Sequence, residues 1–183
     1  MTLCTYTKLH QLIENGLLEG VPLENINGAS VDLTLADTLW IEDQGASGNV
    51  VDLAAKETPT LQKIVMHPEG HYDLMPGEFC LAASREVFDV PLHVGGKFLV
   101  KSSLARSGLN HLLAGWIDPG WHGSALTLEL HNCLRHHALR LRPGMKIGQA
   151  VFWAGDPVPL DKSYQVRGQY NLDREAQPSK GVR

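Results

Sequence analysis

The chain has 183 residues, of which 43% are hydrophobic, so it can bury a full core and is expected to form a single domain over residues 1–183. Its formal net charge of -4 at pH 7 excludes a global basic field for nucleic acid, so an anionic ligand must be held locally. The three cysteines are odd in number and far apart, which favours a reducing compartment, by default the cytoplasm. No window approaches the roughly 20 apolar residues of a membrane span, so we expect a soluble protein without a membrane partner.

The first predicted element is a short amphipathic helix near the N-terminus. Leu9, Leu12 and Ile13 fall on one helical face. Thr7 can cap the start of this helix, and Gly16 can end it. No other stretch of the sequence has a comparable helical periodicity.

After this helix the hydrophobic period changes to two, which is typical of strands. In residues 30–35, Val31, Leu33 and Leu35 share one face, while Asp32 lies on the other, where it is either functional or only an outer polar residue. Further runs of this kind lie at residues 71–82, 97–103, 124–132, 137–142 and 145–153. Two Pro-Gly turns, at residues 76–77 and 143–144, each predict a strand, a tight turn and a returning strand. The sequence therefore predicts a mostly antiparallel β architecture, a barrel or a sandwich.

The C-terminal residues, from about 165 onward, lack aliphatic periodicity. They predict a flexible tail that becomes ordered on a ligand or a partner chain.

A glutamate stands in the leucine-rich run of residues 125–132. The leucines of this run share one face, so Thr127, Glu129 and His131 point to the other. One interpretation is an ordinary half-buried strand with a wet face. The other is a carboxylate held on a rigid strand as a general acid and base.

A run of hydrogen-bond donors lies at residues 100–109. Lys101, Ser102, Ser103 and Arg106 supply ammonium, hydroxyl and guanidinium groups, and Gly108 lets the backbone approach a ligand. This inventory suits phosphate, although a solvated loop with two unrelated cations is an equal alternative. No Walker pattern and no G-x-G-x-x-G motif is present.

Nine histidines raise the question of a metal. His136 and His137 are adjacent, so on a strand their rings would point to opposite faces and could not hold one ion. Residues 67–69 imitate the first half of the zinc deaminase signature, but no P-C-x-x-C follows. We therefore expect no zinc site.

Six motifs, in order and at compatible spacing, carry a family resemblance. They are "PLENINGASVDLTL", "YDLMPGEFCLAASREVFDVP", "KSSLARSGL", "AGWIDPGW", "TLELHN" and "LRPGMKIGQAVF". From about residue 7 to residue 170 the chain resembles the dCTP deaminases of the dUTPase superfamily. The resemblance implies a dUTPase-like distorted β-barrel, a homotrimer with sites between subunits, and conversion of dCTP and water to dUTP and ammonia. It also implies Mg²⁺ bound with the triphosphate, no zinc, and a product that supplies thymidylate synthesis.

The resemblance also implies roles for individual residues. Glu129 resembles the proton shuttle of the family. Ser102, Ser103 and Arg106 match contacts around the reacting water and the phosphates, and the donor Lys101 is expected to bind the substrate with them. Asp118 matches the position that faces the deoxyribose, Thr127 lies beside the base, and Tyr164 matches the tyrosine that closes over the nucleotide. His111 and the Ala114 backbone match a segment that flanks the water.

The chain departs from the family pattern at several positions. Leu113 and Trp116 replace residues near the expected pocket. In the tail, Gln169 stands where the family has lysine and Asp173 where it has glutamine, which moves the local charge by two units against a triphosphate. The alternatives are that Arg167 or Arg174 compensates, which we favour, that Asp173 binds the Mg²⁺, or that the substrate carries fewer phosphates.

Three alternatives to a simple dCTP deaminase remain open. Parts of the motifs resemble the bifunctional branch, which also hydrolyses dUTP to dUMP and diphosphate. A non-catalytic nucleotide-binding protein on the same fold is a second alternative, because fold does not fix function. A dUTPase without deaminase activity is the third.

Overall fold

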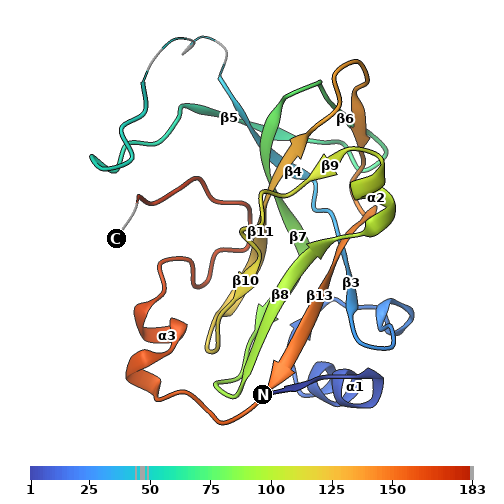
Figure 1. Cartoon of the computed structure of the whole chain (residues 1–183), viewed down its shortest axis with the longest axis vertical. Coiled ribbons are helices and arrows are strands. Elements are labelled where there is room, and N and C mark those ends of the chain that lie inside the picture. The colour runs from blue at the N-terminus through green and yellow to red at the C-terminus, as the bar shows by residue number, and fades with distance from the viewer. Residues whose placement is uncertain (44, 46–47, 49, 182–183) are drawn as a thin grey trace.

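The structure is a computed structural model that describes the whole chain except residues 44, 46–47, 49 and 182–183 (Figure 1). Its helical segments are short: α1 Tyr6–Glu14, η1 Leu23–Asn25, α2 Ser102–Arg106, η3 Leu160–Lys162 and α3 Tyr164–Arg167. The long strands are β7 Phe79–Asp89, β8 Val94–Val100, β11 His122–Asn132 and β13 Lys146–Ala154. The shorter strands are β1 Thr2–Leu3, β2 Leu18–Glu19, β3 Val31–Thr34, β4 Thr38–Glu42, β5 Leu61–Val65, β6 Tyr72–Leu74, β9 Leu109–Asn110, β10 Trp116–Ile117 and β12 Leu139–Leu141.

The strands form two main sheets and one small one. One main sheet has the order β1-β13-β8-β10, and β3 also pairs with β13. The other has the order β5-β4-β7-β11-β9, and β2 also pairs with β7. All of these pairs are antiparallel, which confirms the predicted mostly β architecture.

The main hydrophobic core combines apolar side chains from both sheets. Leu33 of β3, Phe98 of β8, Leu128 of β11 and Phe152 of β13 are almost completely buried in it. On β11 the predicted alternation is confirmed, because the leucines of residues 126–130 are buried while Thr127 and Glu129 face the opposite side and are only partly buried. The core therefore fixes which side chains β11 presents on its other face.

The N-terminal helix is present, but its predicted cap is wrong. Helix α1 begins at Tyr6, so Thr5 is the N-cap residue and Thr7 lies within the first turn. Leu9 and Leu12 are buried, as expected. Asn15 ends the helix and Gly16 follows with a φ of 90°, a conformation that favours glycine.

The two Pro-Gly turns are present, but the strands around each turn do not pair with one another. Strands β6 and β12 pair together as a separate two-stranded sheet. Each turn then leads from this small sheet into a long strand, β7 or β13, of a different sheet. The predicted returning strands are therefore partly wrong, because the local turn signal does not define the pairing partner.

Candidate active site

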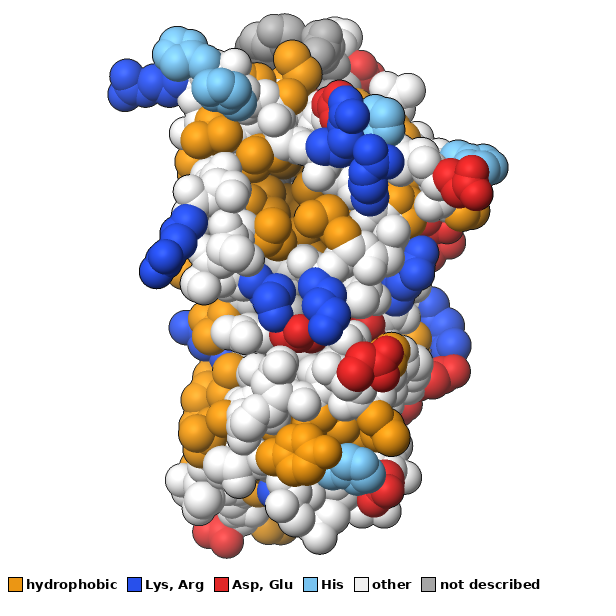
Figure 2. Space-filling view, turned by 90° about the vertical axis from the view of Figure 1, so that its right-hand side faces the viewer, with side chains coloured by type: hydrophobic (Ala, Val, Ile, Leu, Met, Phe, Trp, Pro, Cys, Tyr) orange, Lys and Arg blue, Asp and Glu red, His pale blue; other side chains and the backbone are white. Residues whose placement is uncertain are grey.

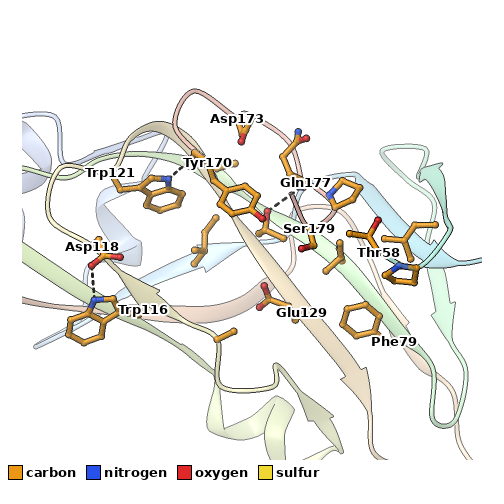
Figure 3. A pocket seen from close by; sticks show the side chains of 18 of the residues that line it. Thr58, Phe79, Trp116, Asp118, Trp121, Glu129, Tyr170, Asp173, Gln177 and Ser179 are labelled. Carbon is orange, nitrogen blue, oxygen red and sulfur yellow. Dashed lines mark hydrogen bonds between the residues drawn. The ribbon is translucent and has the colours of Figure 1, made fainter. Parts of the chain in front are cut away.

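A cavity of about 430 Å³ lies between β11, the loop around Asp118 and the C-terminal tail (Figure 3). Strand β11 and β7 form its floor, and segments from β5, β10 and the tail form its walls. Its lining includes seven of the residues that the sequence analysis singled out, namely Ala114, Trp116, Asp118, Thr127, Glu129, Tyr164 and Asp173.

Glu129 occupies the middle of β11, opposite Leu81 of β7, and its carboxyl group points into the cavity (Figure 3). Its Oε2 atom is buried and has no hydrogen-bond partner among the residues that the structure describes. Burial raises the pKa of Glu129 to about 7, and a hydrogen bond to its own backbone is a smaller, opposing cause. Near neutral pH this carboxyl group can therefore both accept and release a proton.

Asp118 and Trp116 form one end of the cavity (Figure 3). The indole Nε1 of Trp116 donates a hydrogen bond to Oδ1 of Asp118 over 3.0 Å, which orients the carboxylate. Phe79 and Thr58 lie toward the other end. The cavity thus has an oriented carboxylate at one end and the Phe79 ring toward the other, with Glu129 between them.

The C-terminal tail runs beside β11 and forms one wall of the cavity. The Tyr170 carbonyl accepts hydrogen bonds from Trp121 Nε1 and Ser124 Oγ, both over 2.8 Å. Further along, the Asp173 carbonyl accepts from the Ala125 amide over 2.9 Å. These bonds hold the tail in place here, and its flexibility from about residue 165 stays a prediction.

Tyr164 begins α3 at the edge of the cavity. Its amide donates to the Pro119 carbonyl over 3.0 Å, which attaches α3 to the loop that contains Asp118. Burial raises the pKa of the Tyr164 hydroxyl, so this hydroxyl stays neutral and can donate a hydrogen bond. Gln169 follows on the tail but does not line the cavity.

The donor run lies elsewhere in the chain. Residues Ser102–Arg106 form helix α2, where the sequence suggested a strand end or a loop, and Ser102, Ser103 and Arg106 are exposed. Neither they nor Lys101 line the cavity, and Figure 1 places α2 on the side of the molecule away from the tail. That side faces the viewer in Figure 2, where Lys and Arg side chains gather below a hydrophobic hollow.

Lys101 is held at the start of α2 by the carboxylate of Asp32. The Lys101 ammonium lies 2.6 Å from Asp32 Oδ1, and the Lys146 ammonium lies 3.0 Å from Oδ2. Asp32 is only 3% exposed, so it is not an outer polar residue of its strand. Burial alone would raise the pKa of Asp32, but the hydrogen bonds from the two lysines lower it overall.

Comparison with known proteins identifies the family. The sequence model of the dCTP deaminase-like family matches residues 3–155. The chain belongs to this family. A protein of Corynebacterium diphtheriae named "dCTP deaminase, dUMP-forming" is 43% identical over 124 residues, which cover 66% of this chain but only 65% of that protein. A Methanopyrus kandleri protein with the same name is 30% identical over 98% of this chain and 96% of its own length.

A solved structure supports the fold. The 2'-deoxycytidine 5'-triphosphate deaminase of Agrobacterium tumefaciens matches with a TM-score of 0.64 over 84% of this chain and 48% of that chain. Its sequence identity is 17%, so the likeness concerns the fold alone. The β fold expected from the resemblance to this family is therefore confirmed.

In this dCTP deaminase-like chain the loop beside Ala114 is strained. Leu112 and Leu113 both have positive φ values, of 53° and 64°, which is uncommon for residues other than glycine. His111, just before them, is 4% exposed, and neither ring nitrogen has a hydrogen-bond partner among the described residues. Burial and then the charge of Lys97 lower the pKa of His111, and the nearby Phe98 backbone, whose geometry is too poor for a hydrogen bond, opposes this without reversing it, so the ring is neutral near pH 7.

Several residues of the cavity were not singled out from the sequence. Trp121 and Tyr170 contribute aromatic walls, and Ser179 contributes a hydroxyl from near the end of the tail. Trp121 lies within a family motif, and its position there was the available signal. The loop residue Thr58 and the tail residue Ser179 have no local signal, because only the tertiary path of the chain brings them here.

A side chain at Gly108, which has a φ of 92°, would collide with Leu134, so the glycine serves local packing.

Within the described ranges, no group of three or more His, Cys, Asp and Glu side chains is placed to hold a metal ion. No helix in those ranges is long and apolar enough to cross a membrane.

Proposed function

We propose that the protein deaminates dCTP, converting dCTP and water to dUTP and ammonia. One observation carries the proposal: the Glu129 carboxyl group faces the cavity with a pKa raised to about 7, and its buried Oε2 atom has no hydrogen-bond partner in the described part of the chain. An unpaired buried carboxyl oxygen is costly for folding, and such groups cluster at functional sites.

The chemistry of the reaction fits one carboxyl group on a rigid strand. Attack on C4 of cytosine requires a water that loses a proton, a proton delivered to N3, and a further proton delivered to the departing amine. Glu129 accepts the first proton of the water as the C–O bond forms and passes it to N3. It then takes the second proton from the new hydroxyl group on C4 and delivers it to the amine, so that ammonia leaves as the C–N bond breaks and the carbonyl forms. A pKa close to the working pH suits both directions of transfer.

The other lining residues are assigned to binding. Asp118, oriented by Trp116, would face the deoxyribose, Thr127 the base, and Tyr164 would close over the nucleotide. Thr127 Oγ1 already accepts a hydrogen bond from the Gln177 amide over 3.3 Å, so the tail and the base-facing strand are connected.

The phosphate contacts are proposed to come from a second chain. Because α2 of the same chain does not reach the cavity, Ser102, Ser103 and Arg106 would act in a neighbouring site of a homotrimer. Mg²⁺ would enter with the triphosphate, whose oxygens are the ligands it prefers. No zinc is assigned to the reaction.

A second candidate function is the formation of dUMP. It is favoured by the names of the Corynebacterium and Methanopyrus relatives, which are both called dUMP-forming. In this case the protein would also hydrolyse dUTP to dUMP and diphosphate after the deamination.

A parallel assay with dCTP, dCMP and dUTP, in which both ammonia and diphosphate are measured, tests both candidates. Ammonia from dCTP without diphosphate supports the simple deaminase, whereas both products support the dUMP-forming enzyme. Diphosphate from dUTP without ammonia from dCTP would indicate a dUTPase. Tight nucleotide binding with neither product would indicate a non-catalytic member of the family.

A further inference from the structure

The tail places an acid in the wall of the cavity and a lysine directly against it. Oδ2 of Asp173 lies 2.6 Å from the ammonium of Lys180. The same ammonium donates to the Gln169 carbonyl over 2.9 Å and lies 4.8 Å from the centre of the Tyr170 ring. Lys180 therefore contacts both tail positions at which this chain departs from its family, and the ring between them.

Arg174 and Arg167, the two arginines in the described part of the tail, have other partners. Arg174 lies 3.5 Å from Glu19 in a pair whose side chains are 65% and 64% exposed. The Nε atom of Arg167 donates to the Asp161 carbonyl over 2.8 Å. The partner of Asp173 in this structure is Lys180, and the arginine compensation at a bound nucleotide stays a prediction.

An uncompensated carboxylate at Asp173 would oppose the binding of an anionic nucleotide. Its side chain is 22% exposed and belongs to the wall of a partly closed cavity, where solvent screens a charge less than on an open surface. At an effective dielectric constant of about 20, one charge roughly 10 Å from a phosphate changes affinity on the order of tenfold. The effect grows with the number of phosphates.

We propose that Lys180 is a positioning residue for nucleotide binding, acting as the counter-charge that lets Asp173 stand in the cavity wall. This inference rests on the proposed function. The lysine acts through Asp173 and not by touching the substrate. Its backbone amide separately donates to the Tyr170 hydroxyl over 2.9 Å, so a change of the side chain leaves this tail contact in place.

The test compares Lys180→Met, Lys180→Arg, Asp173→Asn and the double variant Lys180→Met/Asp173→Asn. We expect Lys180→Met to raise the KM for dCTP on the order of tenfold, with little change in kcat and a smaller change for dCMP. Lys180→Arg should keep the KM near that of the wild type. Asp173→Asn should lower it, and the double variant should return it close to the wild-type value.

Lys162→Met is the matched control, because Lys162 pairs with Asp161 on the exposed surface of η3. A normal KM for Lys180→Met would overturn the inference. So would a double variant that stays as weak as Lys180→Met, since that result means that Lys180 touches the nucleotide or only fastens the tail. If neither the wild type nor any variant releases ammonia, the proposed function fails. The dissociation constants of dCTP for the same variants, measured by calorimetry, then still test the role of Lys180, so the two failures are recognised separately.

Discussion

Glu129→Gln is expected to stabilise the folded protein at neutral and alkaline pH, although it removes the proposed proton shuttle. Burial raises the pKa of Glu129 from 4.5 to about 7. Each pKa unit corresponds to about 1.4 kcal/mol, so the shift corresponds to about 3 kcal/mol. Because the cavity is open to solvent, we expect a measured gain of about 1 to 3 kcal/mol.

The effect has a defined pH window. Below pH 4.5, the ordinary pKa, the carboxyl group is protonated in both states and costs nothing. As the pH rises from there through about 7, the unfolded chain ionises first, and the stability that the protonated carboxyl group contributed is lost. Glutamine stays neutral, so the variant gains on the wild type across this window and keeps a constant advantage above it.

The measurement is the free energy of unfolding by urea at about pH 4.5 and about pH 8.5, at one fixed protein concentration. The difference between Glu129→Gln and the wild type should increase between the two pH values. Glu24→Gln, at an exposed position of η1, is the control and should show no such increase. Equal pH dependence in Glu129→Gln and wild type would refute the claim that Glu129 is held as a buried acid.

Three further predictions concern assembly, an internal ion pair and metal. Mixing inactive Arg106→Ala and Glu129→Gln chains should regenerate ammonia release through hybrid sites, and verified subunit exchange without activity would contradict shared sites. Asp32→Asn should lower the free energy of unfolding by about 2 kcal/mol, because Lys101 and Lys146 lose their anion. Since the pKa of Asp32 is lowered, this loss should be seen above pH 3.8 and shrink as the pH falls through the folded-state value, and an unchanged urea midpoint at neutral pH would contradict it. Dialysis against a zinc-selective chelator should leave full activity once Mg²⁺ is restored, whereas a loss reversed only by Zn²⁺ would contradict the zinc-free proposal.

The sequence predicted the long strands β11 and β13 closely, β7 and β8 only in part, and the short elements poorly. On β11 the two faces meet different surroundings, so the alternation of leucines with Thr127 and Glu129 is visible without a structure. The two-residue strands β1, β2, β9 and β10 are too short to have any period. Helix α2, with five residues, is similarly short, and tertiary contacts such as the Lys101–Asp32 pair help to fix its start.

The site was predictable where its residues belong to ordered motifs. Asp118 and Glu129 lie in such motifs, and the structure brings both to one cavity. The tail was not predictable, because its contacts depend on the path of an irregular segment along β11. Lys180 illustrates this: it is seven residues from Asp173, and no periodicity connects the two.

The central claim is that Glu129 performs proton transfer in the deamination of dCTP. The most direct test measures ammonia release from dCTP by the wild type and by Glu129→Gln, together with dCTP binding by both. The account predicts ammonia from the wild type and a loss of at least about 100-fold in kcat in the variant, with binding nearly unchanged. Comparable ammonia release by the variant, or none by a wild type that binds dCTP, would contradict it.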